Sequence, residues 1–213
     1  MELKIIKPFG PSVVKVKIPE KTIFERNNYI DQIVKDKKKS LELDYGTKLV
    51  GDVTQEIVLE KDIMQKSGWA DFIASCTSNW IKTEIKKNIS KFMLKNSWVV
   101  RQFKNEYNPT HWHDGHVSGA GFLKLPDNMG QHTQSQKTDH KKYEGGYLQL
   151  IHGSRMFACE ATLSIEPKVG DLYLFPNYLM HAVFPFKDSD QERRSISFNA
   201  LIDENIYNPY GKN

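Results

Sequence analysis

The pattern of apolar and polar residues changes near residue 96. Before that point apolar residues mostly recur at intervals of three or four, which indicates helices, and after it short β-branched and aromatic segments alternate with turn residues, which indicates strands. Seven such segments follow, at 97–103, 118–126, 145–153, 161–167, 170–176, 181–186 and 193–203. We therefore expect a mainly β protein with N-terminal helices (α+β), in which residues 96–205 form a sandwich or jelly roll.

The first 95 residues are expected to form a helical N-terminal elaboration with one or two strands. Residues 12–18 alternate between apolar residues and lysines, as in a half-buried strand that ends before Pro19. Helical spacing predicts a first helix over about 22–38 and one or two helices over 61–89. Residues 41–59 are mixed, and their last four residues read as a short strand.

Composition narrows the class of protein. With 213 residues, of which 39% are hydrophobic, the chain can bury one sizeable core, so we expect a single domain. The net charge of +4 comes from interspersed charges, and nucleic acid is therefore not an expected partner. Cys76 and Cys159 form no CxxC motif, which favours a reducing compartment. No apolar leader or membrane span is visible, so we expect a soluble, cytoplasmic protein that does not contact membranes.

Histidines are concentrated in one short stretch. Three of the seven, His111, His113 and His116, fall within six residues. On an extended segment, side chains two positions apart point the same way, so His111 and His113 can present both imidazoles to one point while Trp112 faces away. Neutral imidazole is a common ligand of divalent iron and zinc. His181, which lies between two apolar segments, is the natural third ligand because an unpartnered ring would be costly to bury there.

Two simpler interpretations compete with a metal site. Clustered histidines are often a solvated loop, and a single histidine in an apolar segment is often a hydrogen-bonded core residue. The last strand segment favours a functional interpretation, because its alternation places Arg193, Ser195 and Ser197 on one face. Arg194 shares the other face with apolar residues suited to a packing layer. Arg193 and Ser195 should therefore face the barrel interior, where a guanidinium and a hydroxyl can hold a carboxylate.

Four segments, in their order along the chain, resemble the Fe(II)/2-oxoglutarate-dependent dioxygenases, in particular a phage and bacterial group akin to prolyl hydroxylases. These segments are 105–119, 122–126, 169–186 and 192–199. The resemblance covers residues 98–203. It implies a double-stranded β-helix (jelly roll, cupin-like) and iron held by two histidines and usually one carboxylate. It also implies that Arg193 and Ser195, as the family's Arg-x-Ser pair, grip the far carboxylate of the cosubstrate 2-oxoglutarate. With O2, such an enzyme hydroxylates a C–H bond and releases succinate and CO2.

The sequence departs from this family at one position. The usual motif is His-x-Asp, and here the third residue is His113, while the nearby carboxylate of Asp114 comes one residue later. Either the ligands are His111, His113 and His181, or a local turn recruits Asp114 or His116. A three-histidine site still suits Fe(II) with open coordination positions.

Other functions remain open at the level of sequence. The main alternatives are a cupin-like three-histidine metalloprotein, acting as a direct dioxygenase or a zinc protein, and a non-catalytic jelly-roll binding module. An Arg-x-Ser anchor on the last core strand favours the oxygenase, since neither alternative needs it. The expected substrate is a small molecule or a peptide side chain. We also expect the polar residues 127–145 to form a flap over the barrel mouth.

Overall fold

The computed structural model describes residues 3–6, 10–132, 142–157 and 159–210 of the chain. A major sheet contains, in spatial order, β1 (Lys4–Ile6), β2 (Val13–Lys17), β9 (Asp171–Pro176), β6 (Val117–Lys124), β11 (Arg193–Ile202), β4 (Phe92–Gln102) and β3 (Gln55–Val58). A minor sheet contains β5 (Asn108–His111), β10 (Met180–Val183), β7 (Leu148–Ile151) and β8 (Thr162–Ile165). The helical elements are α1 (Glu20–Lys35), α2 (Lys37–Glu42), the 3-10 turn η1 (Gly46–Lys48), α3 (Lys61–Lys66), α4 (Trp69–Ile85) and α5 (Glu204–Tyr207).

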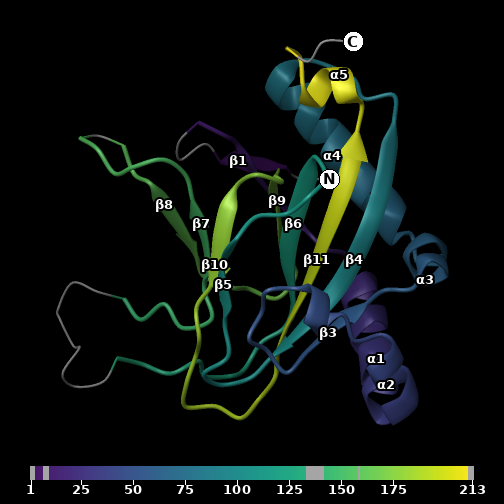
Figure 1. Ribbon diagram of the computed structural model, residues 1–213, viewed down its shortest axis with the longest axis vertical. Coiled ribbons are helices and arrows are strands. Elements are labelled where there is room, and N and C mark those ends of the chain that lie inside the picture. Colours follow the sequence, from purple (N-terminus) through teal and green to yellow (C-terminus); the bar gives the residue numbers. More distant parts are fainter. Residues whose placement is uncertain (1–2, 7–9, 133–141, 158, 211–213) are drawn as a thin grey trace.

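The last eight strands form the predicted jelly roll, or double-stranded β-helix. Strands β9, β6, β11 and β4 form one layer, and β5, β10, β7 and β8 form the layer facing it (Figure 1). Neighbouring strands within each layer pair antiparallel. The expectation of a mainly β fold with N-terminal helices is confirmed. Strands β2 and β3 then widen the major sheet at its two edges, next to β9 and β4.

Some element boundaries differ from those expected. The first helix ends at Lys35, because Asp36 adopts an extended conformation and its carboxylate accepts hydrogen bonds from the backbone N–H groups of Lys38 and Lys39, which begin α2. The boundary expected at residue 96 falls inside β4, and three strands precede it. Of the expected flap over residues 127–145, the part at 133–141 lies outside the described residues.

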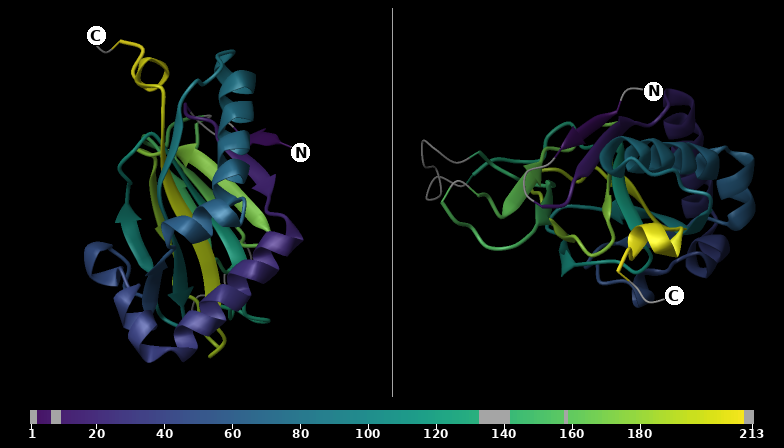
Figure 2. Two further views of the ribbon diagram at one scale, coloured as in Figure 1. Left: turned by 90° about the vertical axis from the view of Figure 1, so that its right-hand side faces the viewer. Right: turned by 90° about the horizontal axis from the view of Figure 1, so that it is seen from above.

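Helices α1 and α4 cover the face of the major sheet that is turned away from the minor sheet (Figures 1 and 2). The main core lies between these helices and the major sheet. It contains Ile30 of α1, Ile73 of α4, and Ile196 and Phe198 of β11. A smaller core of eight buried residues, Phe122 and Phe175 among them, lies between the two sheets and packs beside the cavity described below. Trp69 at the start of α4 belongs to the main core, with an exposed fraction of 1%.

Gly119 in β6 lies close to the ring of Phe198 and to the backbone of Tyr173. A Cβ atom there would lie 2.4 Å from the ring of Phe198 and 2.7 Å from the carbonyl oxygen of Tyr173. Because the second contact is with backbone, we expect Gly119→Ala to lower the free energy of unfolding by about 1–3 kcal/mol. Urea titration would measure this loss. Gly10→Ala is the matched control, because among the described residues its Cβ would come no closer than 3.5 Å, to the ring of His152. Equal stability of the two variants would contradict the prediction.

None of the helices in the described part of the chain is long and apolar enough to cross a membrane.

Candidate active site

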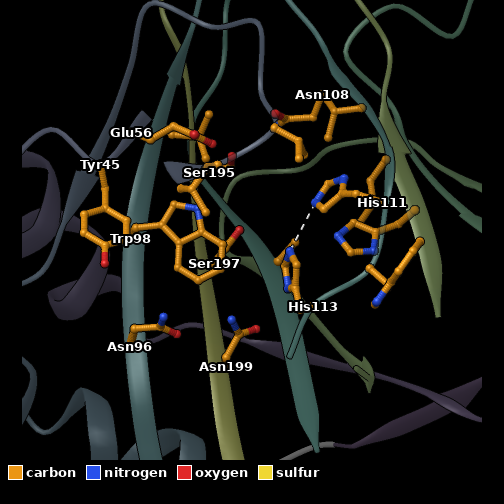
Figure 3. Close-up of a pocket in the computed structure, with 18 of the residues that line it drawn as sticks. Tyr45, Glu56, Asn96, Trp98, Asn108, His111, His113, Ser195, Ser197 and Asn199 are labelled. Atoms are coloured by element: carbon orange, nitrogen blue, oxygen red, sulfur yellow. Dashed lines mark hydrogen bonds between the residues drawn. The ribbon is translucent and has the colours of Figure 1, made fainter. Parts of the chain in front are cut away.

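The three histidines come from the adjacent ends of β5 and β10. These strands pair antiparallel, and His111 lies directly opposite His181. His113 follows β5 by two residues, and its backbone N–H donates to the carbonyl of Asn177 at 3.1 Å. The Asn177 amide in turn donates to the His113 carbonyl at 3.0 Å. This pair of bonds ties the segment after β5 to the segment before β10, so that His113 turns toward His111 (Figure 3).

The three imidazoles converge on one point. Their centroids are 4.2–5.0 Å apart, and one ring nitrogen of each lies within 4.8 Å of the others. Nδ1 of His111 lies 2.7 Å from the carbonyl oxygen of Pro109, and Nδ1 of His181 lies 2.9 Å from that of Leu179. Because a carbonyl only accepts, both Nδ1 atoms carry the proton. Both Nε2 atoms therefore carry a lone pair, that of His111 facing Nε2 of His113 at 3.1 Å, and this is the arrangement that prepares an imidazole for a metal.

Burial keeps the three rings neutral. It lowers the pKa of His111, and together with the neighbouring His111 it lowers the pKa of His113 to about 4. The pKa of His181 is also well below the ordinary value, mainly because of burial. A metal binds neutral imidazole, so no proton has to leave at neutral pH. Three nitrogen donors facing a cavity suit Fe(II) with coordination positions left for other ligands.

The other two candidate ligands, Asp114 at the cavity and His116 outside it, are held by other partners. The Asp114 side chain is 70% exposed and pairs with the ammonium group of Lys95 at 2.6 Å. The His116 ring stacks on Tyr207 with centroids 4.0 Å apart, and its Nδ1 accepts from the backbone N–H of Ile202 at 3.1 Å. Neither side chain joins the cluster of His111, His113 and His181, which is the group of possible metal ligands found within the described residues.

Arg193 is a buried cation that pairs with no carboxylate among the described residues. Its side chain is 1% exposed and donates from Nε to the carbonyl of Gly146 at 3.1 Å and from a terminal nitrogen to Ser195 Oγ at 3.3 Å. The guanidinium lies 5.3 Å from the centroid of Phe122. Burial lowers the pKa of Arg193 to about 10, so it stays charged at neutral pH. Among the described residues no carboxylate pairs with it, which leaves it available to an anion.

Arg194 faces the opposite side of β11. It donates to both carboxylate oxygens of Glu192 at 2.9 and 2.8 Å, and to Asp31 of α1 at 2.7 Å. The alternation predicted for this strand is therefore confirmed. Arg194 fastens the sheet to helix α1, whereas Arg193 faces the cavity.

One cavity of about 400 Å³ joins these groups. The three histidines, Arg193 and Ser195 line it together with residues that the sequence did not single out; these include Tyr45, Glu56, Asn96, Trp98 and Asn108. Trp98 contacts His113 edge-on, with centroids 5.3 Å apart. Figure 3 shows Glu56 and the histidines on opposite sides, with Ser195 and Ser197 between them. A sequence signal for Glu56 existed, namely a carboxylate within a short apolar strand.

Ionisation of the Glu56 carboxyl group lowers the stability of the folded state. Burial, with a smaller contribution from Asp44, raises the pKa of Glu56 to about 7. Because the folded state binds this proton more tightly than the unfolded chain, stability is lost as the pH rises from about 4.5 to 7. We expect Glu56→Gln to be more stable than the wild type at pH 8, by up to about 3 kcal/mol, and equally stable at pH 4.5. Thermal unfolding at both pH values would measure this, and a pH-independent difference would contradict it.

Comparison with known proteins agrees with this geometry. Residues 96–199 match the sequence model of a family described as "Putative 2OG-Fe(II) oxygenase". No curated protein sequence matches the chain.

Three solved structures share the fold. A Pseudomonas putida prolyl-4-hydroxylase is 12% identical with a TM-score of 0.55, covering 89% of this chain and 91% of that one. The viral collagen prolyl hydroxylase of Paramecium Bursaria Chlorella virus-1, solved as its 2OG complex, is 15% identical with a TM-score of 0.54, covering 88% and 94%. A Trichoplax adhaerens prolyl hydroxylase, solved with a hypoxia inducible factor peptide fragment, is 13% identical with a TM-score of 0.55, covering 94% and 87%.

A jelly roll that brings three neutral histidines and a buried arginine to one cavity has the layout of a non-haem metal enzyme. Residues 96–199, just under half of the chain, match the 2OG-Fe(II) oxygenase family, and the fold is prolyl-hydroxylase-like. Together with the three-histidine cluster, this match indicates a non-haem oxygenase that uses Fe(II), 2-oxoglutarate and O2.

Proposed function

We propose that the protein hydroxylates a C–H bond of its substrate and converts 2-oxoglutarate to succinate and CO2. The observation that carries this proposal is the unpaired cation Arg193, held beside Ser195 in the same cavity as the three histidines. In this reaction one oxygen atom of O2 enters the substrate and the other enters succinate. Bound Fe(II) supplies the oxidising chemistry.

The metal ligands in this proposal are His111, His113 and His181. Their neutral rings offer nitrogen lone pairs to one point, while the carbonyl partners of His111 and His181 fix their tautomers. Compared with a site of two histidines and a carboxylate, this set lacks one negative charge. The bound metal therefore keeps more of its positive charge, which favours binding of an anionic cosubstrate.

Arg193 and Ser195 are proposed to hold the far carboxylate of 2-oxoglutarate. A guanidinium and a hydroxyl can both donate to one carboxylate, and burial strengthens those hydrogen bonds. The anion would also neutralise a buried charge that the fold itself leaves unpaired. Neither a zinc protein nor a non-catalytic binding module needs such an anchor, so we favour the oxygenase over both alternatives.

We propose that the substrate is a small molecule or a peptide side chain. The Trichoplax adhaerens neighbour was solved with a peptide fragment, which supports a peptide side chain. Tyr45 and Trp112 also line the cavity and are 36% and 66% exposed, so part of its lining faces solvent.

Anaerobic addition of Fe(II) and then 2-oxoglutarate tests the proposed function. We expect a weak visible charge-transfer band from the metal chelate, followed by succinate formation when O2 is admitted. Absence of both with fully folded protein would contradict the proposal. Retention of zinc in place of iron, without succinate formation, would favour the zinc alternative.

A further inference from the structure

Glu56 occupies the side of the cavity away from the histidines. It is the second residue of β3, its side chain is 2% exposed, and it lines the same cavity as the histidines and Ser195. Register fixes its position, because Glu56 is paired with Val100 of β4 and Val100 is paired with Ser195 of β11. The backbones of Glu56 and Ser195 are thus two strand spacings apart, about 10 Å. A ligand side chain of moderate length can span this distance.

The Glu56 carboxylate forms no ion pair within the described part of the chain. Its Oε2 is buried without a hydrogen-bond partner among the described residues. Arg101, on the neighbouring strand, is engaged with Glu192 at 2.9 Å. Lys48, which also lines the cavity, lies with its ammonium group 4.4 Å from the centroid of the Tyr45 ring and does not pair with Glu56. A buried, unpaired carboxylate is unfavourable for folding, so its presence in a cavity points to a ligand.

The other polar groups near Glu56 also favour a donor-rich ligand. Asn96 Oδ1 is a second buried acceptor without a partner among the described residues, and Asn96 lines the cavity too. The indole of Trp98, 6% exposed, lies between these two residues and the histidines (Figure 3). An ammonium or guanidinium group only donates hydrogen bonds and is attracted to an aromatic face. Acceptors beside an indole therefore suit a cation better than a neutral or anionic group.

We propose that Glu56 is the specificity-determining residue for the substrate, and that it binds a cationic amine or guanidinium group, as on a lysine or arginine side chain. This inference rests on the proposed function, since it assumes that the same cavity holds the substrate during hydroxylation. With the cationic end at Glu56, the carbon atoms of the side chain extend past Trp98 toward the histidines. Hydroxylation then falls on a carbon between the charged group and the backbone.

Calorimetric titration of four probes tests this inference: the Nα-acetyl amides of lysine, arginine, norleucine and glutamate. Norleucine has an aliphatic chain like that of lysine without its ammonium group. Each is titrated into metal-free protein and into anaerobic protein loaded with Fe(II) and 2-oxoglutarate. We expect lysine or arginine to bind at least tenfold more tightly than norleucine, and glutamate to bind most weakly. Glu56→Gln should remove the preference for the cation while leaving norleucine binding unchanged.

Glu60→Gln is the matched control, because it removes a carboxylate just after β3 that pairs with Lys39 outside the cavity. It should keep the preference for the cation. Norleucine binding as tightly as lysine and arginine to the wild type, or a cation preference that survives in Glu56→Gln, would overturn the inference. The chelate band separates the two proposals: a normal band without a cation preference contradicts only the role of Glu56. A missing band contradicts the proposed function, while the metal-free titrations still test Glu56.

Discussion

Replacing His181 with alanine should abolish tight Fe(II) binding and, with it, succinate formation. His181 lies opposite His111 across the β5–β10 pair, and its Nε2 lone pair is free because Nδ1 donates to Leu179. Removing it leaves two imidazoles, and loss of a ligand should weaken metal affinity by more than the roughly 10- to 100-fold known for supporting residues. Anaerobic calorimetry with Fe(II) measures the affinity directly, independent of any substrate.

Two further variants make this result specific. His116→Ala removes a ring that stacks on Tyr207, and Asp114→Asn removes a carboxylate paired with Lys95, so both should bind Fe(II) as the wild type does. Full metal retention in His181→Ala would contradict the three-histidine assignment. Loss of metal in Asp114→Asn would instead make Asp114 a ligand.

Local alternation accounts for what could be predicted from the sequence. In β11 the period of two separates Arg193 from Arg194, and the structure places them on opposite faces of the sheet. The same rule brought His111 and His113 to one side, although His113 lies just beyond the strand. Apolar segments between turn residues also identified seven of the eight jelly-roll strands, and they missed β5, whose residues NPTH show no apolar pattern.

His116 is close to His111 and His113 in the sequence, but its side chain does not join them in the structure. Gly115, with a φ of 92°, turns the chain directly after Asp114, and a Cβ atom there would lie 3.0 Å from the carbonyl oxygen of Ala200. The turn directs His116 toward Tyr207 in α5 rather than toward His111. A single glycine in a His-rich stretch does not reveal which way the chain turns, so the sequence left this alternative open.

Long-range register explains why the substrate side of the cavity could not be predicted. Glu56 and Ser195 are 139 positions apart, and they come to flank the same β4 residue, Val100, only because β3 and β11 both pair with β4. Nothing in the local pattern around residue 56 specifies that pairing. Trp98 is similar: it reads as a core aromatic residue, and its contact with His113 depends on how the two sheets face each other.

Arg193→Ala should weaken 2-oxoglutarate binding by roughly ten- to more than hundredfold, because a hydrogen bond to a charged group contributes about 1.5–3 kcal/mol. Arg194→Ala is the matched control on the same strand. It breaks contacts with Glu192 and Asp31 and should lower stability, yet leave cosubstrate affinity nearly unchanged. Titration of 2-oxoglutarate into the anaerobic Fe(II) proteins, followed by the chelate band, gives both affinities, with circular dichroism showing that each variant is folded. A large loss in folded Arg194→Ala with none in Arg193→Ala would mean that the carboxylate binds on the helix side of β11, and the cavity between the sheets would then lose its assignment as the cosubstrate site.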